Sequence, residues 1–222
     1  MGHHKEGIQL GKEGLEIFER LGDATEQAQC LINLTRPLHH DGQLDAAEEA
    51  ASRAIGLISE NGDQYLVAGS HYVLGNIYRS RGKLEKAVHH FEVSLRIVSS
   101  FNWRSELFLI HHDLAVLFSM AGKFGDAQAH IERAKPHMID NAYFLAFVIG
   151  LQARLWHRQG RFEEANSEAL RAADIFEKLG AAQNLERYNR FLQEIEETMR
   201  TPIASNFDGE VPKIVLLPTS TD

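Results

Sequence analysis

The stretch GNIYRSRGKLEKA, residues 75–87, decides the fold because its Gly82-Lys83 step fits two incompatible structures. A phosphate-binding P-loop needs four residues between its first glycine and the Gly-Lys pair, with Ser or Thr next. Here six residues separate Gly75 from Gly82, and Leu84 follows Lys83. The sequence therefore favours a tight turn between two helices over an ATP-binding loop.

Related turns recur along the chain with spacings of 40, 40 and 38 residues, at Gly42, Gly82, Gly122 and Gly160. Small residues recur at fixed distances from each glycine, and a large apolar residue lies four positions before it. A glycine ends one helix, and small residues let two helix backbones approach closely. The pattern therefore predicts a series of helical hairpins. The small residues are Thr35, Gly75, Ala115 and Ala153, then Ala47, Ala87, Ala127 and Ala165, then Ala54, Ser94, Ala134 and Ala172; the large ones are Leu38, Tyr78, Phe118 and Trp156.

The repeat predicts an all-α fold of about ten helices between residues 5 and 199, because every segment has helical periodicity and none alternates as a strand. Pro37 is expected to interrupt the first helix of the first repeat, and Pro136 to end or bend the second helix of the third. The remaining segment is expected to be a flexible tail, in which residues 213–217 form a short apolar run. The expected parts are a half repeat at 5–22, repeats at 23–62, 63–102, 103–140 and 141–180, a capping helix at 181–199 and the tail at 200–222.

Composition argues against several classes of partner. The net charge of -8 and the absence of a dense Lys/Arg run disfavour nucleic acid. A single cysteine, Cys30, and an N-terminus without a long apolar core indicate a reducing, cytoplasmic location. The most apolar window, residues 142–151, is about half the length of a membrane helix, so no membrane partner is expected.

The repeat resembles the tetratricopeptide repeat (TPR) family, in a roughly 40-residue variant of the usual length of about 34. This resemblance implies a right-handed α-solenoid of antiparallel hairpins, the TPR-like superhelix. The chain is also similar to the longer-period arrays attached to STAND-type signalling ATPases, whose ends are matched by ERLGD and EKLG. The residues at the family's signature places in the second repeat are Leu74, Gly75, Tyr78, Gly82, Ala87 and Phe91.

Twelve histidines suggest a metal site, but adjacent residues on a helix diverge by about 100°, so doublets such as His89-His90 do not chelate together. Neither zinc-ligand spacing nor a nucleophile motif of the GxSxG type occurs. We therefore expect no catalytic residues, no metal and no cofactor. His71 and His111 occupy the same repeat position, which favours a stacked polar pair between successive repeats.

In the TPR family the first helix of each repeat lines a concave groove, which makes the outward positions of those helices the candidate binding residues. They mix aromatic, amide and cationic side chains, a combination that suits a peptide with some acidic character. The implied function is a non-catalytic scaffold that binds a partner protein or peptide. The alternative is a regulatory or sensor piece of a STAND-type ATPase or transcription regulator whose catalytic domain is absent from this chain. Oligomeric state stays open. The candidate residues are Tyr72, Asn76, Arg79, His112, Val116, Arg154 and His157.

Overall fold

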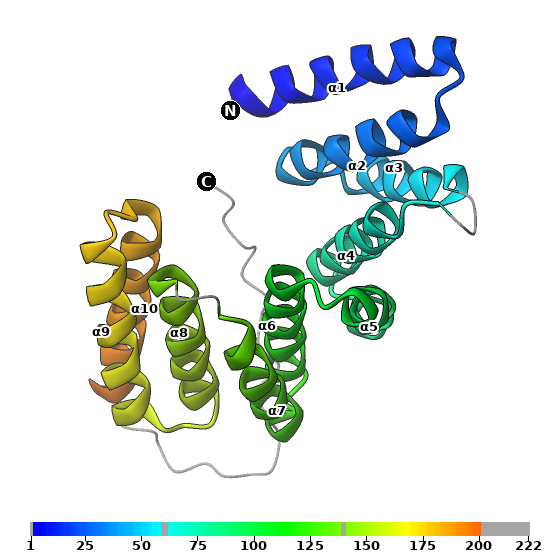
Figure 1. Ribbon diagram of the computed structural model, residues 1–222. Coiled ribbons are helices and arrows are strands. Elements are labelled where there is room, and N and C mark those ends of the chain that lie inside the picture. Colours follow the sequence, from blue (N-terminus) through cyan, green and yellow to red (C-terminus); the bar gives the residue numbers. More distant parts are fainter. Residues whose placement is uncertain (1, 59–61, 139–140, 201–222) are drawn as a thin grey trace. The chain divides into compact units, whose positions relative to one another are not determined.

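The computed structural model describes residues 2–58, 62–138 and 141–200, and within these ranges the chain consists of ten α-helices and one short 3-10 helix, without strands (Figure 1). The all-α prediction is thereby confirmed. The helices form two compact units, α1 to the first part of α6 and the rest of α6 to α10, with the boundary between Ile110 and His111. The helices are α1 (Gly2–Leu21), α2 (Ala24–His40), α3 (Leu44–Leu57), α4 (Gln64–Ser80), α5 (Leu84–Phe101), α6 (Arg104–Met120), α7 (Phe124–Ala134), the 3-10 helix η1 (Lys135–His137), α8 (Ala142–Arg158), α9 (Phe162–Lys178) and α10 (Ala182–Arg200).

Short capping signals define where the helices begin and end. The side chains of Asp23, Asp63 and Asn141 accept hydrogen bonds from backbone N–H groups at the starts of α2, α4 and α8. The turn glycines have φ between 66° and 77°, a left-handed conformation that glycine adopts without strain. Asn102 takes the same conformation, with φ of 53°, after α5. Local chemistry therefore fixes the hairpin turns. The turn glycines are Gly22, Gly42, Gly82, Gly122, Gly160 and Gly180.

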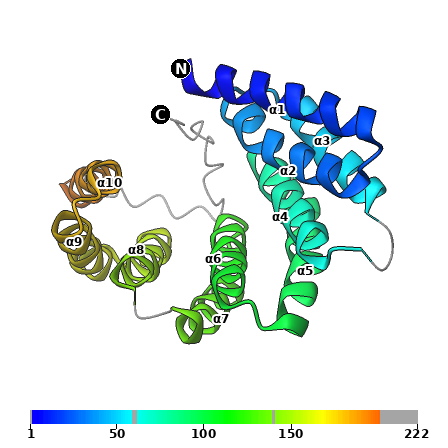
Figure 2. The same cartoon turned by 45° about the horizontal axis from the view of Figure 1, so that its top comes forward.

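In the first unit the helices pack as successive neighbours, and α1 lies beside α2 (Figure 2). Ala47 and Ala87, at matching repeat positions of α3 and α5, are fully buried. Gly75 is equally tight, because an added Cβ would lie 2.7 Å from the ring of Phe91. Small residues are thus required where two backbones meet.

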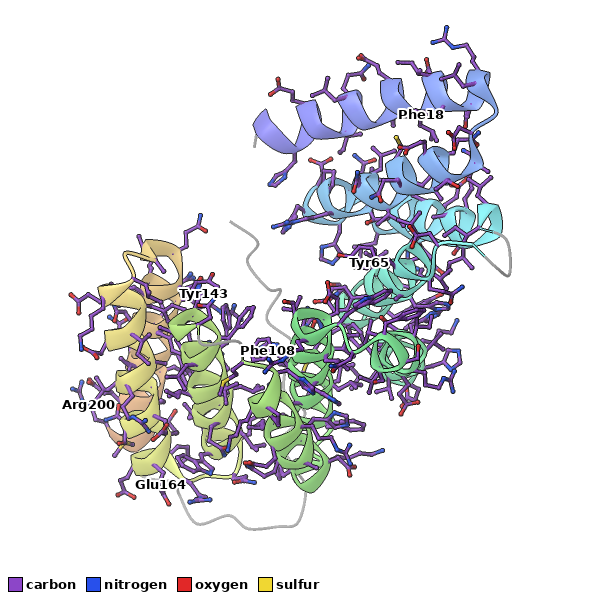
Figure 3. All side chains as sticks on the ribbon, viewed as in Figure 1. Phe18, Tyr65, Phe108, Tyr143, Glu164 and Arg200 are labelled. Carbon is purple, nitrogen blue, oxygen red and sulfur yellow. The ribbon has the colours of Figure 1, made fainter. Side chains whose placement is uncertain are left out.

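The second unit has its own core, built by α8, α9 and α10 around Phe176, Tyr188 and Phe191. Gly150 makes room for Tyr188, since a Cβ there would lie 1.6 Å from the Tyr188 hydroxyl. Because α9 and α10 pack together across a short turn, α10 ends beside the start of α9. Figure 3 accordingly shows Glu164 and Arg200 at the same end of the pair.

The two prolines behave differently. α7 ends at Ala134 and Pro136 lies in the following 3-10 turn, as predicted. Pro37, by contrast, does not interrupt its helix, because α2 continues to His40. A proline in the last turn removes one backbone donor, and the Pro37 ring packs 3.7 Å from the position of a Cβ at Gly7. The predicted tail, apart from Arg200, lies outside the described residues.

Candidate functional site

The predicted residues of the first unit lie together on α4. Asn76 Nδ2 donates to the carbonyl oxygen of Tyr72 at 3.2 Å, and Arg79 Nη2 donates to Asn76 Oδ1 at 2.7 Å. All three side chains are half-buried. The Tyr72 ring lies 5.5 Å from that of the buried Phe91, so this tyrosine also packs on the core. Asn76 thereby orients the guanidinium of Arg79, which suits recognition of a carboxylate.

His112 and Val116 lie on the part of α6 that belongs to the second unit, and both are half-buried. His112 Nδ1 lies 3.2 Å from Asp113 Oδ1, and the imidazole meets the ring of Phe147 edge-on at 5.8 Å. His112 therefore rests against α8 and is held by a neighbouring carboxylate. Val116 offers apolar surface only.

Arg154 and His157 lie on α8 and contact residues of α10. The Arg154 guanidinium stacks over Phe191 at 4.5 Å and over Tyr188 at 5.6 Å. The His157 ring meets Phe162 and Phe191 edge-on, each at 5.4 Å between ring centroids. Within the described residues, the buried Nε2 of His157 has no hydrogen-bond partner.

Electrostatics around these two residues favour an anionic ligand. Burial is the main cause that lowers the pKa of His157 and of Arg158, and the charge of Arg154 lowers both further. The carboxylate of Glu194 on α10 acts in the opposite direction. α8 therefore concentrates positive charge that an added carboxylate would stabilise.

Two pairs of histidines at matching repeat positions form hydrogen bonds that the sequence analysis did not identify. The Nδ1 atoms of His71 and His90 are 3.0 Å apart, as are those of His111 and His130. The expected pairing of His71 with His111 is therefore wrong. Each pairs with a histidine 19 residues later in the same hairpin, because the two helices of one hairpin face each other. The repetition of His90 and His130 eight positions after a turn glycine was the available signal.

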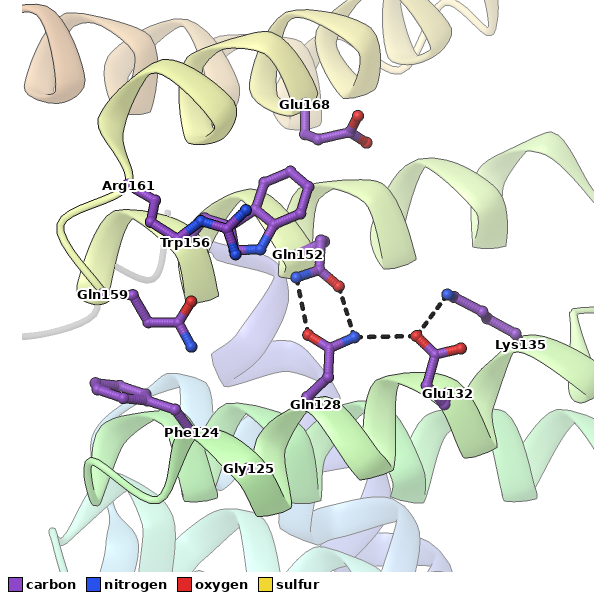
Figure 4. Close-up of a pocket in the computed structure, with 10 residues that line it drawn as sticks. All are labelled: Phe124, Gly125, Gln128, Glu132, Lys135, Gln152, Trp156, Gln159, Arg161 and Glu168. Atoms are coloured by element: carbon purple, nitrogen blue, oxygen red, sulfur yellow. Dashed lines mark hydrogen bonds and ion pairs between the residues drawn. The ribbon is translucent and has the colours of Figure 1, made fainter.

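A groove of about 640 Å³ separates α7 from α8 and the start of α9, and we call it the α7–α8 groove (Figure 4). Gln128 and Gln152 form a reciprocal amide pair across it, with N···O distances of 3.0 and 2.9 Å. The Arg161 guanidinium covers the indole of Trp156 at 4.7 Å. None of the predicted site residues lines this groove. The lining residues are Phe124, Gly125, Gln128, Glu132, Lys135, Gln152, Trp156, Gln159, Arg161 and Glu168.

The described residues contain neither a candidate metal-binding cluster nor a helix suited to span a membrane. Among them, no group of three or more His, Cys, Asp or Glu side chains could hold a metal ion. Likewise, none of the helices in the described ranges is both long and apolar enough to cross a membrane.

Residues 150–173, which span the end of α8, the Gly160 turn and most of α9, match the family model of the tetratricopeptide repeat. A solved TPR protein from Thermus thermophilus is similar over 86% of this chain and 99% of its own, with 20% identity and a TM-score of 0.58. The chain has a tetratricopeptide-repeat fold. Its fold class is thus the all-α solenoid that the sequence predicted.

Two further solved structures resemble this chain. BtubC (BKLC) from P. vanneervenii matches 96% of this chain and 95% of its own, with 17% identity and a TM-score of 0.65. A Rap protein complexed with competence and sporulation factor matches 86% of this chain and 58% of its own, with 15% identity and a TM-score of 0.62. At such identities the likeness concerns the fold alone. The comparison with curated proteins found no match.

Proposed function

We propose that this protein is a non-catalytic scaffold that binds an acidic segment of a partner protein on the first helices of its repeats. The TPR fold supports the proposal, since one structure with the same fold is a Rap protein in complex with a competence and sporulation factor. The observation that carries it is the environment of Arg154. Its half-buried guanidinium is held against two aromatic rings, on the same helix as His157.

The chemistry of the partner follows from these groups. A guanidinium oriented on aromatic rings loses little conformational entropy when it binds a carboxylate. On α4, Arg79 offers a second cation held by Asn76. An Asp- or Glu-containing peptide therefore suits both places.

The test uses methionine substitutions, which keep the apolar stem of an arginine and remove its charge. Arg79→Met and Arg154→Met should each weaken capture of acidic peptides from a synthetic library by about tenfold, or roughly 1.4 kcal/mol. Replacement of Asp and Glu by Asn and Gln in the selected peptides should have a similar effect.

The matched control is Lys178→Met, which removes an exposed cation of α9 that pairs only locally with Asp174. This variant should bind acidic peptides as the wild type does. Equal affinity of the wild type, the two site variants and the control for the same peptides would contradict the proposal. Tyr72→Ala is a poorer test, because loss of the contact with Phe91 would also reduce stability.

The regulatory alternative, the cytoplasmic location and the exclusion of nucleic acid stay predictions. Detection of a P-loop ATPase domain in the same natural polypeptide would favour the regulatory alternative. Binding of nucleic acid at physiological salt would contradict the inference from the net charge of -8.

A further inference from the structure

The α7–α8 groove lies where one hairpin meets the next. At the corresponding place in the first unit, between α3 and α4, charged side chains occupy the junction. At the α3–α4 junction, Arg81 forms ion pairs with both Asp45 and Glu48. The Tyr78 hydroxyl also donates to Glu48, at 2.6 Å. These contacts fill the space between α3 and the end of α4.

The same repeat positions carry different side chains at the α7–α8 junction. Gly125 corresponds to Asp45, Gln128 to Glu48 and Gln159 to Arg81, counted from the turn glycines. No ion pair can form among these three residues, and Gly125 has no side chain to fill the junction. The α7–α8 junction therefore lacks the charged contacts that occupy the α3–α4 junction, and the groove lies there.

The walls of the groove suit an extended peptide with an apolar side chain. Phe124 and Trp156 provide aromatic surface. Gln152 keeps a second amide N–H beyond its pair with Gln128, and Figure 4 shows the Gln159 amide facing the groove. Amide side chains offer the same donors and acceptors as a peptide backbone. The charged lining residues, two acidic and two basic, balance each other.

We propose that the C-terminal segment of this same chain, residues 213–217, docks in the α7–α8 groove. Its sequence, KIVLL, is flanked by Pro212 and Pro218. Proline lacks a donor and disfavours helix in the residue before it, so the run between the two prolines is suited to an extended conformation. β-Branched and leucine side chains supply the apolar anchors.

The connection is long enough for this contact. α10 ends at Arg200 beside the start of α9, where Arg161 lines the groove (Figure 3). The twelve residues 201–212 reach about 40 Å when extended. Two helices side by side are only about 20 Å wide, so the tail can pass around the α8–α9 turn. Attachment to the same chain also gives the segment a millimolar effective concentration.

Amide hydrogen exchange of the full chain tests the proposal. The amides of residues 213–217 should exchange at least about tenfold more slowly than in a free peptide of the same sequence. Ile214→Asp combined with Leu216→Asp should restore the fast rate. The control, Ser205→Asp with Ser220→Asp, adds equal charge outside the apolar run and should leave the protection unchanged.

A second variant closes the groove with the side chains of the first unit: Gly125→Asp, Gln128→Glu and Gln159→Arg. It should remove the protection of residues 213–217 while circular dichroism stays helical. If this variant unfolds, the tail variants alone decide. Exchange of residues 213–217 at the free-peptide rate in the wild type would overturn the proposal, and so would protection that appears only with dimer formation in sedimentation.

Discussion

His111 and His130 share a hydrogen bond between their Nδ1 atoms, 3.0 Å apart and buried in the hairpin of α6 and α7. The bond needs one Nδ1 as donor and the other as acceptor, so at least one of the two rings is neutral. His71 and His90 repeat the arrangement in the first unit. In both hairpins the second histidine stacks on the aromatic residue four positions before the turn, Tyr78 or Phe118.

This pair predicts a loss of stability in mild acid. The pKa values of His111 and His130 are both lowered from 6.5 to about 4, mainly by burial. The charges of His130, His137 and Arg133 also lower the pKa of His111, whereas Arg133 lowers and Asp126 raises that of His130. The unfolded chain therefore takes up protons at a higher pH than the folded chain. The contribution of this pair to the free energy of unfolding is fully present above about pH 6.5 and is lost as the pH falls from about 6.5 to about 4.

Thermal melting near pH 7.5 and near pH 5 measures this effect. His111→Gln with His130→Gln should show a smaller difference between the two pH values, since two glutamines can pair as Gln128 and Gln152 do. An unchanged difference would rule out this pair as a source of the acid sensitivity.

Two glycines of α4 should respond oppositely to alanine. Gly75→Ala places a Cβ 2.7 Å from the Phe91 ring and should cost about 1–3 kcal/mol of unfolding free energy. Gly69→Ala meets nothing within 4 Å and should stabilise the helix by up to about 1 kcal/mol. Urea denaturation compares them, and the same sign for both would show that packing against Phe91 does not decide the outcome.

A similar contrast exists in α1, where Gly11 and Gly14 both face residues of α2. Gly14→Ala leaves an ordinary 3.6 Å contact with Cys30 Sγ, so it should strengthen α1 and slow amide exchange over residues 5–20. Gly11→Ala places a Cβ 2.5 Å from Leu34 and should speed the exchange. In the wild type we expect faster exchange in α1 than in α4. Equal rates in these two helices would contradict that expectation.

The charged junction between α3 and α4 should contribute measurably to stability. Arg81 binds Asp45 and Glu48 with a side chain that is only 17% exposed, so Arg81→Gln should cost about 1 kcal/mol or more. Lys178→Gln breaks an exposed pair with Asp174 and should change little. Chemical denaturation of both variants compares the stability that the largely buried Arg81 ion pairs contribute with that of the exposed Lys178–Asp174 pair.

The sequence alone determined the hairpins. Glycines with positive φ end helices by a local steric rule, and Ala87 or Ala165 repeats at the same distance from each turn because only a small side chain fits there. Such rules need no knowledge of distant residues. Pro37 was misjudged because the cost of a proline depends on its place within the helix, and Pro37 lies in the last turn of α2, which ends at His40.

Only the tertiary structure decided which side chains meet. A repeat position shows that His71 faces a neighbouring helix, but the partner proved to be His90 of the same hairpin. The same holds for the junctions, where a residue from one hairpin must meet a residue from the next. Arg81 reaches Glu48 and closes one junction, whereas Gln159 and Gly125 leave another open. Whether a junction is closed depends on residue pairs such as Arg81 and Glu48, which lie more than thirty residues apart in the sequence and meet only when the hairpins pack.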